Sequence, residues 1–233
     1  MSKFNTFEKE IKKAVLNHLL NKGELKKEVT IVNELTIDSF SRRVDLAILT
    51  DKKIIAYEIK SDADSLYRLS GQLEKYRQYF DKTIVVTTPK HLENILKMVS
   101  DDIEVWEVLE QKITIKKRGK LSRIGNKASY LDLLRVQDMR RLASTFKLPL
   151  SKGGKKEIKS TLTTSIDDIS YEKLKLFVLN VISQRFKLTS TVFLENIIVG
   201  NKVTINDLNF LSPYFEIRKQ YSLVKGSVLE QLK

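Results

Sequence analysis

The apolar residues of the first 110 positions alternate between a helical spacing of three or four and a strand-like spacing of two. A change of spacing marks a change of element, because helices and strands bury their apolar faces at different periods. The pattern predicts helices at residues 5–21, 65–80 and 89–100, and strands at residues 28–37, 44–49, 53–60, 83–88 and 103–109. This order, α-β-β-β-α-β-α-β, predicts an α/β fold with a mixed sheet flanked by helices.

The chain changes character after Ile115, where a basic stretch with two glycines carries no apolar period. Helical spacing resumes beyond it, at residues 129–146, 154–164 and 170–186. We therefore expect the C-terminal part to be all-helical and basic. The predicted division is an α/β domain at 1–117, a linker at 118–128, a helical segment at 129–165 and a further helical region at 166–233.

Charged residues interrupt the two most strand-like segments, at Asp45, Glu58 and Lys60. Glu58 and Lys60 share one face of their strand, about 6–7 Å apart. If Asp51 and Lys52 form a two-residue turn, Asp45 lies directly opposite Glu58, with their Cβ atoms about 4.5–5.5 Å apart. Two carboxylates that close destabilise a sheet unless a positive charge lies between them.

Two interpretations of this cluster remain open. A divalent cation held by Asp45, Glu58, a strand carbonyl and waters would relieve the repulsion and keep a water as potential nucleophile. Lys60 would then help to deprotonate that water and stabilise charge on a phosphate. In the other interpretation, the three residues form a salt-bridge cluster at a sheet edge. Both depend on the hairpin register, because a slip of one residue turns Asp45 to the opposite face.

These residues resemble the motif of the PD-(D/E)XK nuclease superfamily over residues 5–110. The 13-residue spacing from Asp45 to Glu58 is similar to that of archaeal-type Holliday-junction resolvases, and the QxxxY of the next helix is similar to RecB-type nucleases. Residues 58–93 look closer to a group of largely uncharacterised bacterial and phage-borne members. The matching positions are Glu10 or Glu8, Asp45, Glu58-Ile59-Lys60, Gln72 and Tyr76.

The resemblance implies a restriction-endonuclease-like αβββαβ core and a set of roles for these residues. Asp45, Glu58 and the backbone carbonyl of Ile59 would hold Mg²⁺, for which Mn²⁺ would substitute. Lys60 would act on the attacking water, with Gln72 beside it. Glu10 would be an outer ligand, although an ordinary solvent-facing glutamate fits that position equally. The chain departs from the family where Arg-Val, rather than Pro, precedes Asp45.

The helix predicted at 65–80 places Arg68, Gln72 and Tyr76 on one strip, within about 80° of arc. We expect Arg68 and Tyr76 to contact nucleic acid there. Amphipathic packing is the alternative for Gln72 and Tyr76. Asp62 and Asp64 precede this helix and are expected to cap it.

The net charge of +13 favours a polyanionic partner, because neutralising phosphates releases counterions. Residues 1–119 hold 22 Lys and Arg against 19 Asp and Glu, whereas residues 120–233 hold 20 against 10. The excess therefore rises from +3 to +10, and the second half is the basic one.

Residues 130–162 read as a helix, an extended Leu-Pro-Leu-Ser segment, a Lys-Gly-Gly-Lys-Lys turn and a second helix. This arrangement resembles SAP-type helix-extended-helix modules, which commonly bind DNA. Cations at a helix N-terminus suit phosphate contacts, which position a protein without reading sequence. A solvated, lysine-rich loop is the alternative. The residues that we expect to contact DNA here are Arg140, Arg141, Lys152, Lys155 and Lys156.

The absence of Cys excludes thiolate chemistry and Cys-based zinc sites, and two His supply few His-dependent mechanisms. No apolar run approaches the roughly 20 residues of a membrane span, so we expect a cytoplasmic protein without a membrane partner. The leading hypothesis is a Mg²⁺-dependent DNA nuclease, with phage defence, mobile-element biology and DNA repair all open as its pathway. A non-catalytic nucleic-acid-binding or regulatory protein on a nuclease scaffold, and an RNase, are the alternatives. Homodimerisation stays open.

Overall fold

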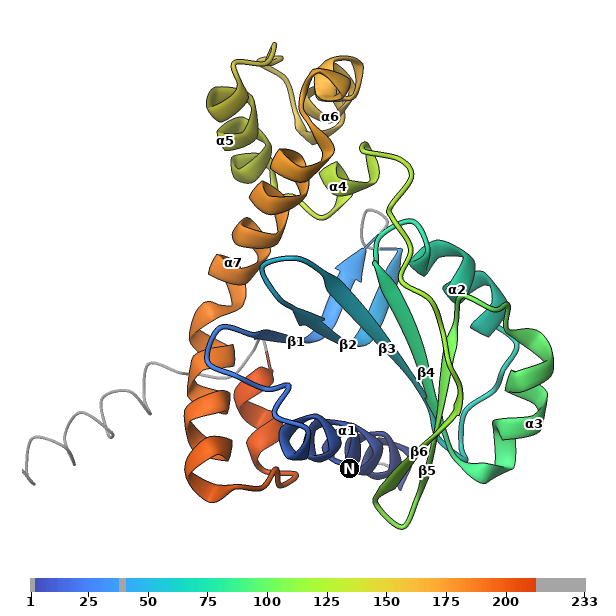
Figure 1. The fold of residues 1–233 in the computed structure, drawn as a ribbon. Coiled ribbons are helices and arrows are strands. Elements are labelled where there is room, and N and C mark those ends of the chain that lie inside the picture. The colour runs from blue at the N-terminus through green and yellow to red at the C-terminus, as the bar shows by residue number, and fades with distance from the viewer. Residues whose placement is uncertain (1–2, 38–40, 213–233) are drawn as a thin grey trace, which may run out of the picture.

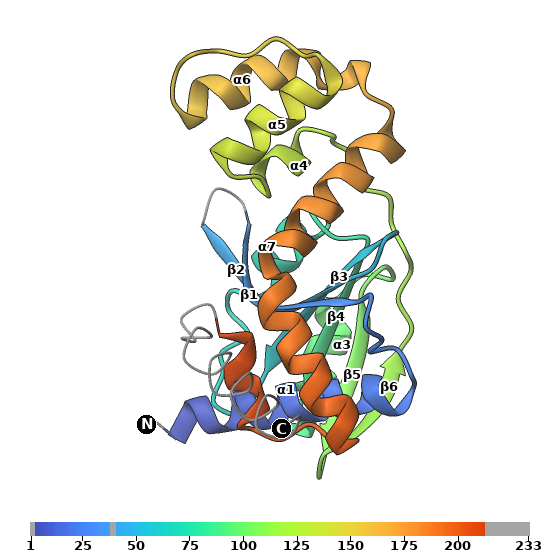
Figure 2. The same ribbon diagram turned by 90° about the vertical axis from the view of Figure 1, so that its left-hand side faces the viewer.

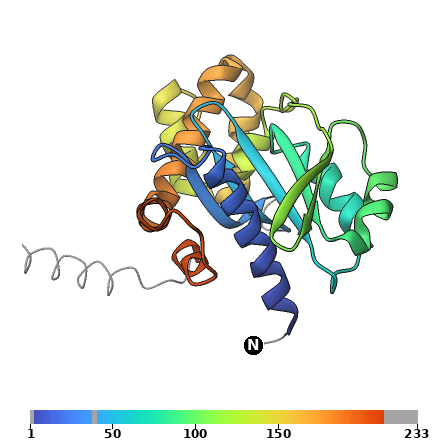
Figure 3. The same cartoon turned by 60° about the horizontal axis from the view of Figure 1, so that its bottom comes forward.

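The computed structural model describes residues 3–37 and 41–212, with the side chains from residue 8 onward. A six-stranded sheet forms the centre, and helices pack on both of its faces (Figure 1). Figure 3 shows α1 crossing one face, with α2 and α3 on the other side of the sheet. The helices of this part are α1 (Lys3–Asn21), α2 (Leu69–Tyr76) and α3 (Pro89–Met98). The predicted mixed α/β class is confirmed.

The sheet order follows the chain, from β1 at one edge to β6 at the other. Pairs β1/β2, β2/β3 and β5/β6 are antiparallel, whereas β3/β4 and β4/β5 are parallel. The parallel pairs require crossovers, which α2 and α3 supply. The strands are β1 (Thr30–Ile37), β2 (Arg42–Leu49), β3 (Ile54–Lys60), β4 (Lys82–Thr87), β5 (Glu104–Leu109) and β6 (Lys112–Lys117).

Strand β6 was not predicted from the sequence. It pairs with β5 through a two-residue turn at Glu110 and Gln111, whose φ angles are 48° and 68°. Such turns favour Gly, Asn or Asp because both central residues adopt positive φ. Glu-Gln carries no such signal. The alternation of Ile113 and Ile115, which are buried and half-buried, was the remaining indication of a strand.

The hairpin register predicted for β2 and β3 is confirmed, since Leu49 pairs with Ile54 and Leu46 with Tyr57. The pairing stops there, one step before Asp45 and Glu58 would meet. Strand β1 is also distorted at this level: Glu34 has a φ of 60°, and the β1/β2 pairing omits Glu34 and Asp45 while keeping its register on both sides. The sheet is therefore irregular where the charged residues lie.

The irregularity exchanges the two faces of β1. Val32 and Leu35 are three residues apart, an odd spacing that places them on opposite faces of a regular strand. Both nevertheless belong to the same hydrophobic cluster, whereas Ile31 belongs to the cluster on the other face. Asp45 lies opposite the kink, and its carboxyl interacts electrostatically with Glu58 of β3 and with Lys12 and Glu8 of α1.

The C-terminal part is helical, as predicted, over the residues that the structure describes. Helix α7 is longer than the helix predicted at 170–186, and residues 213–233 of the predicted helical region lie outside the described residues. The helix predicted at 129–146 is broken between α4 and α5, where Asp138 accepts a hydrogen bond from the backbone N–H of Arg135 at 3.0 Å. The elements are α4 (Ser129–Asp132), α5 (Val136–Phe146), α6 (Lys155–Ser165), η2 (Ile166–Asp168), α7 (Tyr171–Gly200) and η3 (Asp207–Leu211).

Helix α7 runs from the α4–α6 cluster along β1 to the side of α1 (Figure 2). It covers the edge of the sheet: Ser190 Oγ accepts the N–H of Ile31 at 2.9 Å, so that an edge strand donor is satisfied by a side chain. At its far end, Asn17 of α1 exchanges hydrogen bonds of 2.9 and 2.8 Å with the backbone of Val203. None of the helices in the described part of the chain is long and apolar enough to cross a membrane.

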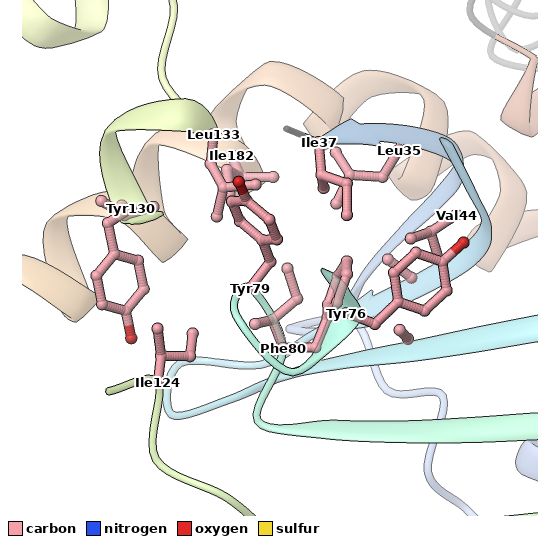
Figure 4. Packing of buried hydrophobic residues seen from close by; sticks show 14 of the residues in the cluster. Leu35, Ile37, Val44, Tyr76, Tyr79, Phe80, Ile124, Tyr130, Leu133 and Ile182 are labelled. Atoms are coloured by element: carbon pink, nitrogen blue, oxygen red, sulfur yellow. The ribbon is translucent and has the colours of Figure 1, made fainter. Parts of the chain in front are cut away.

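One hydrophobic cluster joins the sheet to the helical part. Figure 4 shows Tyr76, Tyr79 and Phe80 lying between β-strand side chains and those of the C-terminal helices. The cluster continues through Ile124 and Tyr130 to Ile182 of α7. The predicted domain boundaries remain a prediction, but the two parts share a core.

The predicted linker is a strap that is fixed to the sheet domain and contains no helix or strand. The N–H groups of Lys120 and Ser122 bond to the carbonyls of Asp102 and Asp81 at 3.1 and 2.8 Å. At Gly119, a Cβ would lie 2.5 Å from the backbone nitrogen of Glu104. Only glycine permits this close approach.

We therefore predict that Gly119→Ala destabilises the protein by about 1–3 kcal/mol or more, because the new methyl group meets backbone rather than a movable side chain. Gly125→Ala in the same strap is the control, since a Cβ there meets nothing within 4 Å. Urea unfolding of both variants tests this. Equal stabilities would show that the strap does not lie against β5.

Candidate functional site

A cleft of about 590 Å³ opens where β2 and β3 part, beside the start of α2. Acids and bases from four segments of the chain line it together. Predicted residues Asp45, Glu58, Ile59, Lys60, Arg68 and Gln72 are all among the lining residues, and Glu8, Arg43, Asp64, Ser65 and Tyr67 complete it.

Glu58 is the centre of the site and is 1% exposed. Its Oε1 accepts hydrogen bonds from Lys60 Nζ and Gln72 Nε2, both at 2.6 Å, and its Oε2 accepts one from the Tyr76 hydroxyl at 2.6 Å. Lys60 Nζ also donates to Gln72 Oε1 at 3.1 Å. Three donors from β3 and α2 thus compensate the burial of one carboxylate.

Asp45 lies at the point where β2 leaves β3. Its Oδ2 accepts the backbone N–H of Ile59 at 2.7 Å and so replaces the lost strand partner. Burial, and then the charge of Glu58, raise the pKa of Asp45 to about 8, although Lys12 and the Ile59 hydrogen bond oppose the shift. The two carboxylates therefore interact, as predicted from the sequence.

The backbone carbonyl of Ile59 faces the same region. The N–H and C=O of one strand residue point to the same side of the strand, and the Ile59 N–H points to Asp45. The predicted ligand set of Asp45, Glu58 and this carbonyl is therefore gathered at one end of the cleft.

The residues fit a hard divalent cation in part. Two interacting carboxylates and a carbonyl are oxygen ligands of the kind that Mg²⁺ accepts, with water completing its shell. Asp45 uses Oδ2 for the Ile59 N–H, and its Oδ1 accepts no hydrogen bond from the described residues. Oε1 of Glu58, in contrast, already accepts from Lys60 and Gln72. A cation at Glu58 competes with these donors. The described part of the chain contains no cluster of three or more Asp, Glu, His or Cys suited to a metal.

The first helix contributes Glu8, rather than Glu10, to the cleft. Glu10 forms an ion pair with Lys13 and is not among the lining residues. Glu8 lies within 2.7 Å of Lys12 Nζ, which also donates to Asn33 at 2.8 Å. The sequence allowed both glutamates, and the helical phase selects Glu8.

Tyr76 was expected at the nucleic-acid-binding surface, and this expectation is corrected by its burial. Its side chain is 0% exposed, and its hydroxyl contacts Glu58 and the carbonyl of Arg43. Burial and the Glu58 carboxylate raise the pKa of Tyr76, so the phenol remains a donor. Tyr76 positions Glu58 instead of contacting a ligand.

Asp62 and Asp64 do not cap α2 as expected, because that helix begins later, at Leu69, with no side-chain cap. Asp64 instead accepts hydrogen bonds from the backbone and side chain of Ser61, at 2.7 and 2.5 Å. The loop that follows β3 is therefore fixed by its own side chains.

The rim of the cleft carries Arg68, which is exposed, and two residues that the sequence did not predict. Tyr67 is 93% exposed, and Arg43 lies at the start of β2 with Glu34 at 3.3 Å. No residue pattern marked Tyr67, because a lone aromatic in a loop has no period. Arg43 lies two residues before Asp45, and the period of two in a strand places both on one face, which was the signal that could have identified it.

The helical part has the predicted helix-extended-helix order in α5, residues 147–154 and α6. Arg140, Arg141, Lys152 and Lys156 are exposed, and Lys155 is half-buried. One backbone N–H at the start of α6 is already used, because Gly154 donates to Glu157 Oε2 at 2.7 Å.

The fold and the cleft define a mixed α/β protein in which a buried glutamate, a half-buried aspartate, a lysine and a glutamine converge at a strand end. Residues 1–212 match the family described as Bacteriophage P4 protein cII. Protein cII of Enterobacteria phage P4 is 33% identical over 222 residues, which cover 94% of this chain and 81% of that protein. The chain belongs to the bacteriophage P4 protein cII family.

Two solved structures are more distant. SPO1766 of Silicibacter pomeroyi, a protein of unknown function, is 15% identical and covers 58% of this chain and 88% of its own, with a TM-score of 0.39. SfsA of Pyrococcus furiosus, in complex with Ca²⁺, is 17% identical and covers 46% of this chain and 62% of its own, with a TM-score of 0.28. Neither likeness is close enough to bear on function.

The raised pKa of Asp45 predicts a pH dependence of stability without divalent cations. In the folded protein Asp45 keeps its proton up to a pH of about 8, whereas the unfolded chain releases it near pH 4. The folded state therefore loses stability relative to the unfolded chain as the pH rises through about 8. We expect the free energy of unfolding in EDTA to fall by about 1–3 kcal/mol between pH 5 and pH 9.

Asp45→Asn should abolish most of this slope and stabilise the protein at high pH, because the amide keeps an acceptor for Ile59 without a charge. Asp51→Asn, in the exposed turn, is the control. Urea unfolding at several pH values measures both, and an unchanged slope in Asp45→Asn would contradict the assignment.

Proposed function

We propose that this protein is a metal-dependent nuclease of the PD-(D/E)XK type, which hydrolyses phosphodiester bonds of DNA. The observation that carries the proposal is the convergence of Asp45, Glu58 and Lys60 where β2 and β3 separate. The α1-β1-β2-β3-α2-β4 order agrees with the restriction-endonuclease-like core that the motif implies.

The side chains divide the work of such a site. Tyr76 and Gln72 hold Glu58 in place, and Asp45 is fixed by the Ile59 N–H. A bound Mg²⁺ would supply Lewis acidity and an activated water. Lys60 Nζ, which donates to Glu58, is placed to orient that water or to stabilise charge on the phosphate.

The remaining charge supports a nucleic-acid substrate. Arg43 and Arg68 lie at the rim of the cleft that holds the acids, so they would contact the backbone beside the reacting phosphate. The exposed cations of the SAP-like α5–α6 segment, Arg140, Arg141 and Lys152 among them, add phosphate contacts that position the substrate.

A second candidate is a nucleic-acid-binding, regulatory phage protein that keeps the nuclease scaffold without catalysis. The hydrogen bonds to Glu58 favour it, because Lys60 and Gln72 already occupy the oxygen that a metal would use. Under this alternative the ion pair is structural, and the basic surface alone is functional.

Catalytic variants separate the two candidates. We expect Asp45→Asn and Lys60→Ala each to reduce Mg²⁺-dependent cleavage by about 10²-fold or more, because each removes a group that acts on the water or the phosphate. Affinity for uncleaved DNA in EDTA should change little. Labelled single-stranded, duplex, flapped and junction DNA, with RNA in parallel, would be incubated with Mg²⁺, Mn²⁺ or EDTA.

Lys97→Ala on α3 is the control, because that side chain is exposed and does not line the cleft. Cleavage that survives Asp45→Asn would refute the site. Salt-dependent binding with no cleavage under either metal would favour the regulatory candidate, and cleavage restricted to RNA would identify an RNase.

The first helix provides a sharper test of the geometry. Glu8→Gln should lower cleavage by about tenfold, because Glu8 lines the cleft and adds to its negative charge. Glu10→Gln on the same helix should leave it near the wild-type rate, since Glu10 pairs with Lys13. The reverse order would return the role to Glu10.

A further inference from the structure

A second cavity, of about 350 Å³, lies between the β1–β2 hairpin and the C-terminal helices. Arg43 lines this groove and also lines the Asp45/Glu58 cleft, so the two cavities meet at one side chain. The other basic lining residues are Arg135, Lys155 and Arg185, which come from the α5–α6 segment and α7.

Most acids near the groove already have partners. Asp138 lies 2.8 Å from Arg185, Asp132 lies 2.5 Å from Lys159, and Glu34 lies 3.3 Å from Arg43. Arg135 is exposed, and no ion pair of its side chain is recorded within the described part of the chain. The pKa of Arg185 is lowered by its own burial and then by the charge of Arg135. Arg135 therefore adds a positive charge to the groove that no ion pair among the described residues neutralises.

We propose that this groove binds the sugar-phosphate backbone of the nucleic acid whose reacting phosphate lies in the cleft, with Arg135 as its main phosphate contact. The inference rests on the proposed function of the cleft and adds to it a path for the substrate. A substrate that follows both cavities passes Arg43 and reaches the helical part between β1 and α5.

The shape and lining of the groove favour a nucleic-acid strand over a single small anion. One phosphate needs one or two cations, whereas the cleft and the groove offer a series that extends from Arg68 through Arg43 to Arg135. The half-buried Phe186 also lines the groove, and such apolar surface suits sugars and bases between phosphates.

The proposal changes which cations of the helical part matter most. Arg135 immediately precedes α5 and Lys155 is the first residue of α6, and both line the groove. Arg140 and Arg141, which the sequence singled out, are not among its lining residues. The helical part would then guide the substrate into the cleft rather than bind it separately.

The test is the salt dependence of binding, measured by fluorescence anisotropy with a labelled oligonucleotide in EDTA. Arg135→Ala should weaken binding about tenfold and reduce the slope of log K against log salt by about one contact. Arg135→Lys should restore most of the slope, because it keeps the charge. Arg118→Ala, an exposed arginine beyond β6 at the opposite edge of the sheet, is the matched control.

An unchanged slope in Arg135→Ala, or an equal loss in Arg118→Ala, would overturn the proposal even if the protein cleaves DNA. Loss of the slope in a protein that never cleaves would uphold the groove and reject the nuclease. Arg135-dependent binding of polyglutamate, without any of the oligonucleotide, would assign the groove to acidic peptides and overturn it as well.

Discussion

The buried carboxylate of Glu58 is the constraint on which the rest of the site depends. A charge that is 1% exposed is costly unless donors surround it, and removing one partner of a buried pair typically costs about 3–5 kcal/mol. Lys60 comes from the same strand, but Gln72 and Tyr76 must come from α2. Helix α2 is therefore held over the end of β3 by polar contacts as well as by its apolar face. The position of the cleft follows from that requirement.

The sequence predicted this arrangement because its signals were local. A two-residue turn fixed the β2–β3 register, and helical spacing placed Gln72 and Tyr76 together. The roles were harder to predict: Tyr76 sits on the strip as expected, yet it points inward to Glu58. A helical period gives the direction of a side chain but not the depth at which its tip ends. The phase of α1, which selects Glu8 over Glu10, likewise depends on how that helix packs on the sheet.

The features that the sequence did not predict depend on contacts between distant segments. The kink at Glu34 appears only when β1 lies against β2, and it exchanges the faces of β1 within a pattern that looked regular. Strand β6 follows a turn without Gly or Asn. The strap at 118–128 lacks any period but is held by backbone contacts and by Gly119. Composition correctly marked that strap as irregular, and it gave no sign that the strap is fixed.

The distribution of charge links the cleft to the groove. Inside the cleft, burial and then the charge of Glu58 raise the pKa of Asp45, so two ionised acids would repel a polyanion and one another until a cation or a proton arrives. At the rim and along the groove, Arg43, Arg68 and Arg135 would attract the polyanion of the proposed function. The acids that repel it and the arginines that attract it therefore lie in different parts of the surface, and Arg43 lines both cavities. A nucleic acid would therefore be held beside the acids before its phosphate reaches them, and a cation bound between the acids would remove the remaining barrier to entry. The distortion of β1 and β2 leaves Asp45 outside the strand pairing, two residues from Arg43. The irregular pairing of the sheet is therefore what makes the Asp45 carboxylate available to the proposed site.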